Sequence, residues 1–328
     1  MHLKIPGESK LKVMNTNKNL KISPLISVAL CTYNGEKYLK QQIESLLSQT
    51  YKNLELIVVD DKSVDKTEEI IQQYMEKDKR IKFFSNDQNL GFNKNFEKAI
   101  SLSTGDFIAI SDQDDLWELN KIEDLYKNIK NNWLIFSNSA LIDSRGEPLG
   151  EFLMKHDDLN QMDYRNFLFS NYTTGHTSMI HRDFLKFYLP IPNEGFYDWW
   201  MGFIAAYHKK IIFYNKVLTK HRVHNNSVIQ TKSPANLDLK SRDNLVFNVV
   251  KQQLYNFKNY PYLQLKDKIF LEEFENAYTN GTKGFSLNLF WLYLKHFDHI
   301  HPDRKCKSFL SKVNYIRKIR RAKNSLSS

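Results

Sequence analysis

The sequence predicts an α/β protein with a mostly parallel central sheet, flanked by helices and followed by a C-terminal helical extension. Between residues 26 and 111, short apolar runs of strand length alternate with segments whose apolar residues recur every three or four positions. The second spacing is that of an amphipathic helix, and strands that alternate with helices form parallel sheets with right-handed crossovers. Three of the four runs end in small polar or acidic residues, and ligands of such sheets bind beyond the carboxyl ends of the strands.

The first half of the chain follows a β-α-β-α-β-α-β order. Leu39, Ile43 and Leu46 form the apolar stripe of its first helix, and Ser63 or Asp65 can cap the second. The expected elements are a strand over residues 26–34, a helix up to Ser48, a strand over 54–61, a helix after the cap, a strand over 81–84, a helix over 93–102 and a strand over 107–111. The polar strand ends of this half therefore point to one crevice.

The pattern of the sequence after residue 111 indicates fewer strands and more helices. The expected elements are a helix over residues 121–130, a strand over 133–143, a turn over 145–148, a loop and a helix over 150–170, a helix that begins near Asp198, a strand over 211–214, and helices over 245–255, 262–278, 285–297 and 305–323, with Gly281, Gly284 and Pro302 between them. Three parts are expected: an N-terminal arm over 1–23, a catalytic domain over 24–232 and a basic helical region over 233–328.

The apolar run that ends at Ser111 is followed by three carboxylates, those of Asp112, Asp114 and Asp115. Carboxylates held close together repel one another, and a hard cation such as Mg²⁺ or Mn²⁺ typically offsets their charge. Such an ion could also bind the phosphate oxygens of a diphosphate. The simpler alternative is a solvated turn after the strand, because isolated Asp-x-Asp triplets are common.

Four short stretches occur in order along the chain. They are residues 27–34 (SVALCTYN), residues 58–63 (VVDDKS), residues 89–91 (NLG) and the Asp-Gln-Asp-Asp run with Trp117 and Lys121. In this order and spacing the set resembles the family 2 glycosyltransferases, which have the Rossmann-like GT-A fold, over roughly residues 24 to 230. The Asp-Gln-Asp-Asp-Leu-Trp form is also similar to a branch of rhamnosyltransferases that build bacterial surface polysaccharides.

The resemblance implies an inverting, metal-dependent glycosyltransferase with Mn²⁺ or Mg²⁺ held by Asp114 and His224. It would move a sugar from a nucleotide-diphosphate donor, dTDP-rhamnose or a UDP-hexose, to a saccharide or lipid-linked saccharide acceptor in capsule, O-antigen or related synthesis. The residues implied to bind the nucleotide and donor are Thr32, Tyr33, Asn34, Asp60, Asp61, Asn89, Gly91, Lys94, Asp112, Gln113 and Arg222. The residues implied to contact the donor sugar or acceptor are Trp117, Gly175, His176, for which a structural role is an equal alternative, and Trp199.

Asp198 is the candidate general base. An aspartate at the start of a helix is ordinarily an N-terminal cap. In inverting members of the family, however, a His-Asp or Glu-Asp pair before such a helix supplies the base, and Asp198 matches the Asp while Tyr197 replaces the first residue. A carboxylate within hydrogen-bond reach can take the proton of an attacking hydroxyl.

Arg222 and His224 match a family segment that completes the metal and diphosphate site. The planar Arg222 guanidinium could bind the diphosphate through two parallel hydrogen bonds. His221 and His224 could instead suggest zinc, but no cysteine lies nearby and a second pair of ligands is missing, so Mg²⁺ or Mn²⁺ is favoured.

Composition limits the alternatives. With 328 residues, 41% of them hydrophobic, the chain can bury a large core, and a net charge of +10 favours a polyanionic neighbour. No nucleic-acid-binding signature occurs in the first two-thirds of the chain, so no nucleic-acid partner is expected. The two cysteines, Cys31 and Cys306, lack metal-ligand spacing, and Cys31 is expected to be a small buried residue.

The chain shows no secretory signal and no apolar run of the ~20 residues that span a membrane. A cytoplasmic protein is expected. In the basic C-terminal segment, Phe309, Leu310, Val313 and Ile316 are spaced as an apolar stripe that could lie on the inner face of the membrane or pack on the catalytic domain.

Two other functions fit parts of this pattern. A non-catalytic nucleotide-sugar or membrane-binding protein would retain the fold without needing Asp114 or Asp198. A sugar nucleotidylyltransferase would need a glycine-rich phosphate loop with a basic residue after the first strand, and residues 32–36 (TYNGE) do not provide one.

Overall fold

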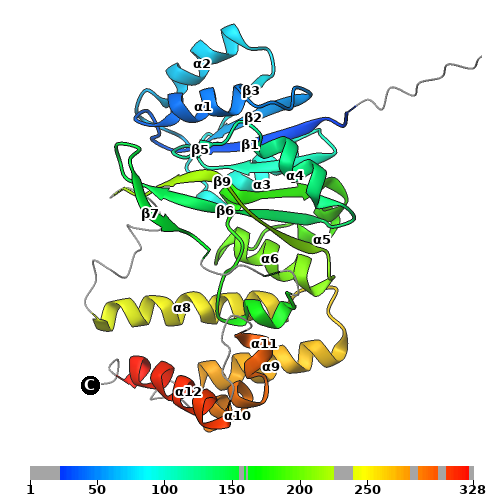
Figure 1. Cartoon of the computed structure of the whole chain (residues 1–328), viewed down its shortest axis with the longest axis vertical. Helices are drawn as coiled ribbons and strands as arrows, with labels where there is room; N and C mark the ends of the chain where they lie inside the picture. Colours follow the sequence, from blue (N-terminus) through cyan, green and yellow to red (C-terminus); the bar gives the residue numbers. More distant parts are fainter. Residues whose placement is uncertain are drawn as a thin grey trace, which may run out of the picture.

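The structure is a computed structural model, and it describes residues 23–154, 159, 162–224, 239–280, 287–301 and 308–324. The predictions for the N-terminal arm up to residue 22, for Cys306 and for the helix breaks at Gly281, Gly284 and Pro302 lie outside the described residues. A sheet with its helices occupies one end of the long axis of the molecule, and a layer of C-terminal helices occupies the other (Figure 1).

A nine-stranded sheet forms the centre of the fold. In spatial order its strands are β3 (Ile81–Ser85), β2 (Leu54–Asp60), β1 (Ile26–Thr32), β4 (Phe107–Ser111), β8 (Ser178–His181), β6 (Leu134–Ile142), β9 (Ile211–Arg222) and β5 (Leu116–Trp117), with β7 (Pro148–Phe152) paired to β6. The first four strands are parallel, as predicted. Thr32 lies level with Asp60, and Leu30 lies level with Ser111, so their polar ends share one edge.

The second half makes the sheet mixed. Strand β8 is antiparallel to β4 and β6, while β9 is parallel to β6 and antiparallel to β5. The strand predicted over 211–214 continues to Arg222, because the pairing with β6 resumes after a register shift and extends to Ile142. This longer strand carries the chain back to the acidic end of β4.

Helices cover both faces of the sheet. They are α1 (Leu39–Leu47), α2 (Thr67–Lys77), α3 (Phe92–Leu102), α4 (Lys121–Ile129), α5 (Leu185–Tyr188) and α6 (Tyr197–Tyr207), with short 3-10 turns η1 (Tyr164–Leu168), η2 (Gly175–Thr177) and η3 (Arg182–Phe184). Alternate residues of β1 enter different cores, Val28 and Leu30 with α1 and α4, and Ala29 and Cys31 with α3 and α6. The helix predicted within 150–170 is the η1 turn in the described part of that segment. The predicted cap of α2 is wrong, because Lys66 and not Ser63 or Asp65 occupies the N-cap position; Asp65 accepts the Thr67 N–H from one residue before it.

The C-terminal helices pack beneath α6 (Figure 1). They are α8 (Leu239–Lys258), α9 (Leu265–Thr279), α10 (Leu287–Lys295), α11 (Phe297–Ile300) and α12 (Phe309–Asn324). Phe203 of α6 and Phe257 of α8 stack with ring centroids 4.0 Å apart, and both side chains are fully buried. Each such aromatic side chain contributes about 1.5–3 kcal/mol to folding. The helical region is therefore joined to the sheet through a shared apolar core.

Candidate active site

The ends of β1 and β2 are tied together by side-chain hydrogen bonds. Thr32 Oγ1 donates to Asp60 Oδ1 at 2.7 Å, and the N–H and hydroxyl of Ser63 donate to the same carboxylate at 2.8 and 2.5 Å. These bonds fix the turn after β2 and place the next residue, Asp61, toward α3.

Asp61 holds the loop that leads into α3. Its carboxylate accepts the N–H groups of Leu90 at 2.7 Å and Gly91 at 2.9 Å, and the Asn86 amide at 2.8 Å. Gly91 has φ +79°, in the left-handed region that favours glycine, at the N-terminal boundary of the helix. The amide of Asn89 donates to the Asp61 carbonyl at 3.2 Å. The residues after β2 thus form one side of a cavity.

A cavity of about 320 Å³ opens at these strand ends. The sequence-predicted residues in its wall are Thr32, Tyr33, Asp61, Asn89, Gly91, Asp112, Gln113, Asp114, Gly175, His176 and Asp198. They come from the end of β1, the loops after β2, β3 and β4, the η2 turn and the start of α6. The structure therefore gathers donor-binding, metal and base candidates around one space.

The two residues predicted to bind the metal lie in direct contact. His224 Nε2 is 2.8 Å from Asp114 Oδ2, although the residues are 110 positions apart. Beside them, burial and then repulsion from the carboxylates of Asp115 and Asp114 raise the pKa of Asp112 well above its usual range. An oxygen-and-nitrogen donor set next to crowded carboxylates fits a divalent cation.

A second polar cluster lies at the floor of the cavity. His221 Nδ1 is 2.8 Å from Asp115 Oδ1, and the His176 and His221 rings stack with centroids 4.4 Å apart. Burial lowers the pKa of His221, but the attraction of Asp115 outweighs it and raises the value to about 9. Burial lowers the pKa of His176 to about 3. At neutral pH, His221 is therefore the cationic partner of Asp115, and His176 is neutral.

If His221 gives up its proton, this cluster can also hold a metal ion. Asp115, His176 and His221 each offer a ligand atom, and these atoms lie within 4.8 Å of one another. Asp115 Oδ2 and His176 Nε2 are buried and have no hydrogen-bond partner among the described residues. Two neighbouring sets of ligands, this one and Asp114 with His224, thus compete as the metal site.

Arg222 stabilises the loop that follows β4 and carries Asp114. Its side chain is buried and donates to the Asp114 carbonyl at 2.9 Å and to Gln41 Oε1 at 2.9 Å. The guanidinium lies 4.5 Å from the centre of the Tyr38 ring. In this structure Arg222 therefore holds the backbone of the metal candidate, and the diphosphate contact implied by the resemblance stays a prediction.

Asp198 lies in the first turn of α6, after Phe196 at the N-cap position. The Trp199 N–H donates to Asp198 Oδ1 at 2.8 Å. Burial raises the pKa of Asp198 to about 6, and hydrogen bonds from the Trp199 and Gly175 N–H groups and the Asn171 side chain limit the rise. A carboxylate with this pKa is ionised near neutral pH and can still accept a proton.

An aromatic wall faces the carboxylates. Phe92, Phe96, Phe196 and Tyr197 line the cavity, and the Phe96 and Tyr197 rings stack at 4.3 Å. The sequence did not indicate this wall or the pairing of His221 with Asp115, which is predicted only as one of three carboxylates after the strand. The four-residue spacing of Phe92 and Phe96 after Gly91 is the one signal that could have indicated it.

The other predicted contacts lie outside the cavity wall. Trp117 is buried, with Lys121 Nζ 3.6 Å from the centre of its ring, and Trp199 is buried, with its indole N–H donating to the Phe167 carbonyl. Lys94 pairs with Glu97. Asn34 accepts the Val64 N–H. Both tryptophans are core side chains here, so their predicted sugar contacts have no support from the geometry.

Replacing Gly175 with alanine is expected to destabilise the start of α6. A Cβ at Gly175 would lie 1.8 Å from the Tyr197 hydroxyl oxygen, and Tyr197 is buried against Phe96. We expect the free energy of unfolding to fall by about 1–3 kcal/mol, measured by urea denaturation. In the Gly175→Ala/Tyr197→Leu double variant the loss should be smaller than the sum of the two single losses; simple additivity would contradict the contact.

Known proteins that are similar to this chain are glycosyltransferases. The family model described as "Glycosyl transferase family 2" matches residues 27–189. An uncharacterised glycosyltransferase of Methanocaldococcus jannaschii is 35% identical over 243 residues, which are 71% of this chain and 77% of that protein. The Escherichia coli UDP-Glc:α-D-GlcNAc-diphosphoundecaprenol β-1,3-glucosyltransferase WfgD is 28% identical over 265 residues, 79% of this chain and 98% of that protein.

Solved structures show the same fold. TarS of S. aureus in complex with UDP-GlcNAc matches with a TM-score of 0.57 at 18% identity, over 92% of this chain and 91% of that one. The mannosyltransferase PcManGT from Pyrobaculum calidifontis, in complex with GDP-Man and Mn²⁺, matches with a TM-score of 0.53 at 14% identity, over 94% and 85%. The predicted GT-A fold is confirmed, and the chain belongs to family 2 of the glycosyltransferases.

Proposed function

We propose that this chain transfers a sugar from a nucleotide-diphosphate donor to a saccharide acceptor with inversion at the anomeric carbon. The observation that carries the proposal is the shared cavity. It brings the Asp112 and Asp114 carboxylates together with Asp198, whose pKa of about 6 suits a general base.

A divalent cation fits the residues present. The crowded carboxylates raise the pKa of Asp112, and Asp114 and His224 offer adjacent oxygen and nitrogen ligands. We propose that Asp114 and His224 hold Mn²⁺ or Mg²⁺. When bound, such an ion would offset the charge of the diphosphate and of its leaving group.

The remaining chemistry belongs to the side chains. Asp198 takes the proton of the acceptor hydroxyl as the oxygen forms a bond to the anomeric carbon. The bond from that carbon to the diphosphate oxygen breaks, and the nucleoside diphosphate leaves with the electron pair. A single displacement inverts the anomeric centre. The Gly175 and Trp199 N–H groups keep the carboxylate oriented for this step.

The nucleoside is proposed to bind along the ends of β1 and β2. Thr32, Tyr33 and Asn89 line that side of the cavity. The carboxylates of Asp60 and Asp61 already accept several hydrogen bonds each, so we propose that they support this surface from below.

The donor and acceptor are proposed from the relatives. WfgD is named for UDP-Glc and for an undecaprenyl-linked acceptor, and the TarS complex contains UDP-GlcNAc. These names favour a UDP-sugar and a saccharide or lipid-linked saccharide of a bacterial surface polysaccharide; dTDP-rhamnose stays the alternative donor. Membership of the family also favours a transferase over a nucleotidylyltransferase.

Thermal unfolding with UDP, dTDP and GDP, each with and without Mn²⁺, tests the proposal. A ligand at 100 times its Kd stabilises the fold by about 2.7 kcal/mol, which raises Tm by several degrees. We expect a Mn²⁺-dependent shift with one nucleotide and release of that nucleotide from its sugar donor when acceptor is added. Nucleotide binding without any turnover, over a panel of donors and acceptors, would favour a non-catalytic binding protein.

A further inference from the structure

The end of the molecule farthest from the sheet exposes large apolar side chains. Leu287 and Trp291 of α10 are 76% and 59% exposed, and Phe309 and Leu310 of α12 are 62% and 71% exposed. These two helices contact each other and lie together at that end (Figure 1). We call these four side chains the tip face. Large apolar side chains exposed on two contacting helices typically mark a contact surface.

The packing of α12 explains why some of its apolar residues are buried and others are exposed. Ile316 is fully buried, the Tyr315 ring lies 5.5 Å from that of Phe297, and Lys312 pairs with Asp298 at 2.5 Å. These contacts hold one side of the helix against α11. The apolar stripe predicted from sequence is therefore split, because Ile316 belongs to the core while Phe309 and Leu310 at the helix start face solvent.

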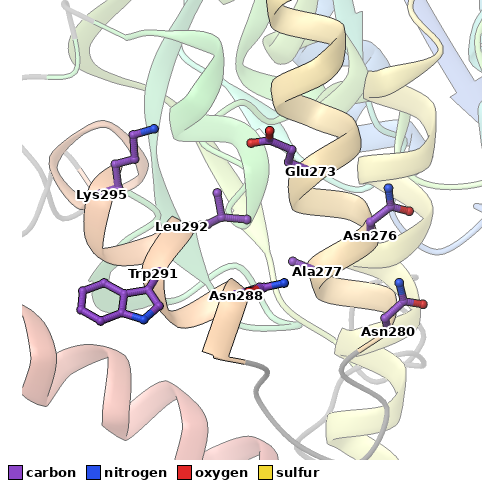
Figure 2. A pocket seen from close by; sticks show the side chains of 8 residues that line it. All are labelled: Glu273, Asn276, Ala277, Asn280, Asn288, Trp291, Leu292 and Lys295. Atoms are coloured by element: carbon purple, nitrogen blue, oxygen red, sulfur yellow. The ribbon is translucent and has the colours of Figure 1, made fainter.

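A groove lies beside Trp291. A cavity of about 560 Å³ lies between α9 and α10, and Glu273, Asn276, Asn280, Asn288 and Lys295 contribute polar side chains to its lining. Figure 2 shows the Trp291 indole directed away from α9, on the outer side of this groove. Trp291 thus borders this groove and also belongs to the exposed tip face.

The charge around the tip face identifies its partner. Residues 304–323 contain nine lysines and arginines and no aspartate or glutamate. In the sequence, Arg317, Arg320 and Arg321 follow Leu310 and Val313 at the three- and four-residue spacing of a helix. Apolar side chains next to a uniformly basic helix are typical of segments that lie on anionic membranes, where tryptophan favours the interface.

We infer that the tip face docks on an anionic lipid bilayer, with Leu287, Trp291, Phe309 and Leu310 in the interface, and that the excess of basic residues in this part of the sequence draws the chain to the lipid phosphates. In the described part of the chain, none of the helices has the length and hydrophobicity needed to cross a bilayer, so the contact is with its surface. This binding goes beyond the transfer reaction and does not depend on it.

Co-sedimentation with vesicles tests the inference on the full chain. Vesicles of phosphatidylcholine alone are compared with vesicles in which about a third of the lipid is phosphatidylglycerol. We expect binding to the anionic vesicles that weakens as salt is added. The Phe309→Asn/Leu310→Asn variant should bind at least about tenfold more weakly. The Arg317→Gln/Arg320→Gln/Arg321→Gln variant should bind roughly a hundredfold more weakly.

The matched control removes two exposed apolar side chains elsewhere in the helical region. Val246→Asn/Leu265→Asn changes residues that are 47% and 75% exposed on α8 and α9, and it should bind as the wild type does. All variants should unfold at the wild-type Tm. Absence of wild-type binding to anionic vesicles, or equal binding by Phe309→Asn/Leu310→Asn, would overturn the inference. The assay contains no donor or acceptor, so a failure of the proposed transferase activity would not affect it.

Discussion

Replacing Asp198 with asparagine is expected to lower kcat by about a thousandfold, because a positioned general base contributes about 10²–10⁴-fold. Asparagine has nearly the same shape but cannot take the acceptor proton. Donor binding should be retained, since the nucleotide side of the cavity is formed by other residues. The measurement is the rate of nucleoside diphosphate release with acceptor present, beside the thermal shift with nucleotide and Mn²⁺. Wild-type kcat in this variant would exclude Asp198 as the base.

The pH profile separates a base from a merely structural carboxylate. Asp198 must be ionised to act, so kcat/KM of the wild type should fall about tenfold per pH unit below pH 6, and this limb should vanish in Asp198→Asn. The free energy of unfolding should depend on pH in the opposite direction. Burial raises the pKa of Asp198 from 3.8 to about 6, so the folded state binds the proton more tightly and the free energy of unfolding falls as pH rises through that range. At pH 7.5 the asparagine variant should therefore unfold at or above the wild-type Tm.

Replacing Asp114 with alanine is expected to abolish the Mn²⁺-dependent part of nucleotide binding and with it the turnover. The carboxylate lies 2.8 Å from His224 Nε2, and its removal takes away a metal ligand while the nucleotide side of the cavity remains. With UDP and Mn²⁺ at saturation, a wild-type Tm increase of about 5 °C or more should fall to the value seen with nucleotide alone. The metal content of the protein can be measured in the same samples.

Three companion variants distinguish the two metal candidates. His224→Ala should reproduce the loss, and Glu118→Ala, which removes a carboxylate outside the cavity wall, should leave the metal response unchanged. His176→Ala disrupts only the ligand set of Asp115, His176 and His221. A metal response that survives Asp114→Ala but is lost in His176→Ala would place the ion in that second set.

The strand order of the first half illustrates what local pattern predicts well. The runs over residues 26–34, 54–61 and 107–111 are predicted as strands with polar ends, and the structure forms parallel strands there, with Thr32 level with Asp60 and Leu30 level with Ser111. Each strand and helix of this half is specified by its own periodicity and by the requirement to bury one or both faces. Contacts from distant segments were not needed to anticipate them.

The second half illustrates where local pattern is insufficient. A strand was expected over residues 211–214, yet β9 continues to Arg222 because β6 supplies a partner for its whole length. The Trp117 and Trp199 side chains were expected at the sugar, yet both enter the core. An aromatic residue near a motif has the same local signature whether it lines a cavity or packs beneath it, and only the neighbouring elements decide between the two.

By itself, the sequence determined the α/β class, the order of most elements, the resemblance to family 2 and the candidate residues Asp112, Asp114, Asp198 and His224. Periodicity and strand-end chemistry are properties of a few consecutive residues, so they can be read without a structure. Only the tertiary structure decided that His224 contacts Asp114 directly, at 2.8 Å, that His221 pairs with Asp115, and that Phe96 and Tyr197 line the cavity. These contacts join residues about 100 positions apart, and their formation depends on how β9, α3 and α6 pack around the sheet.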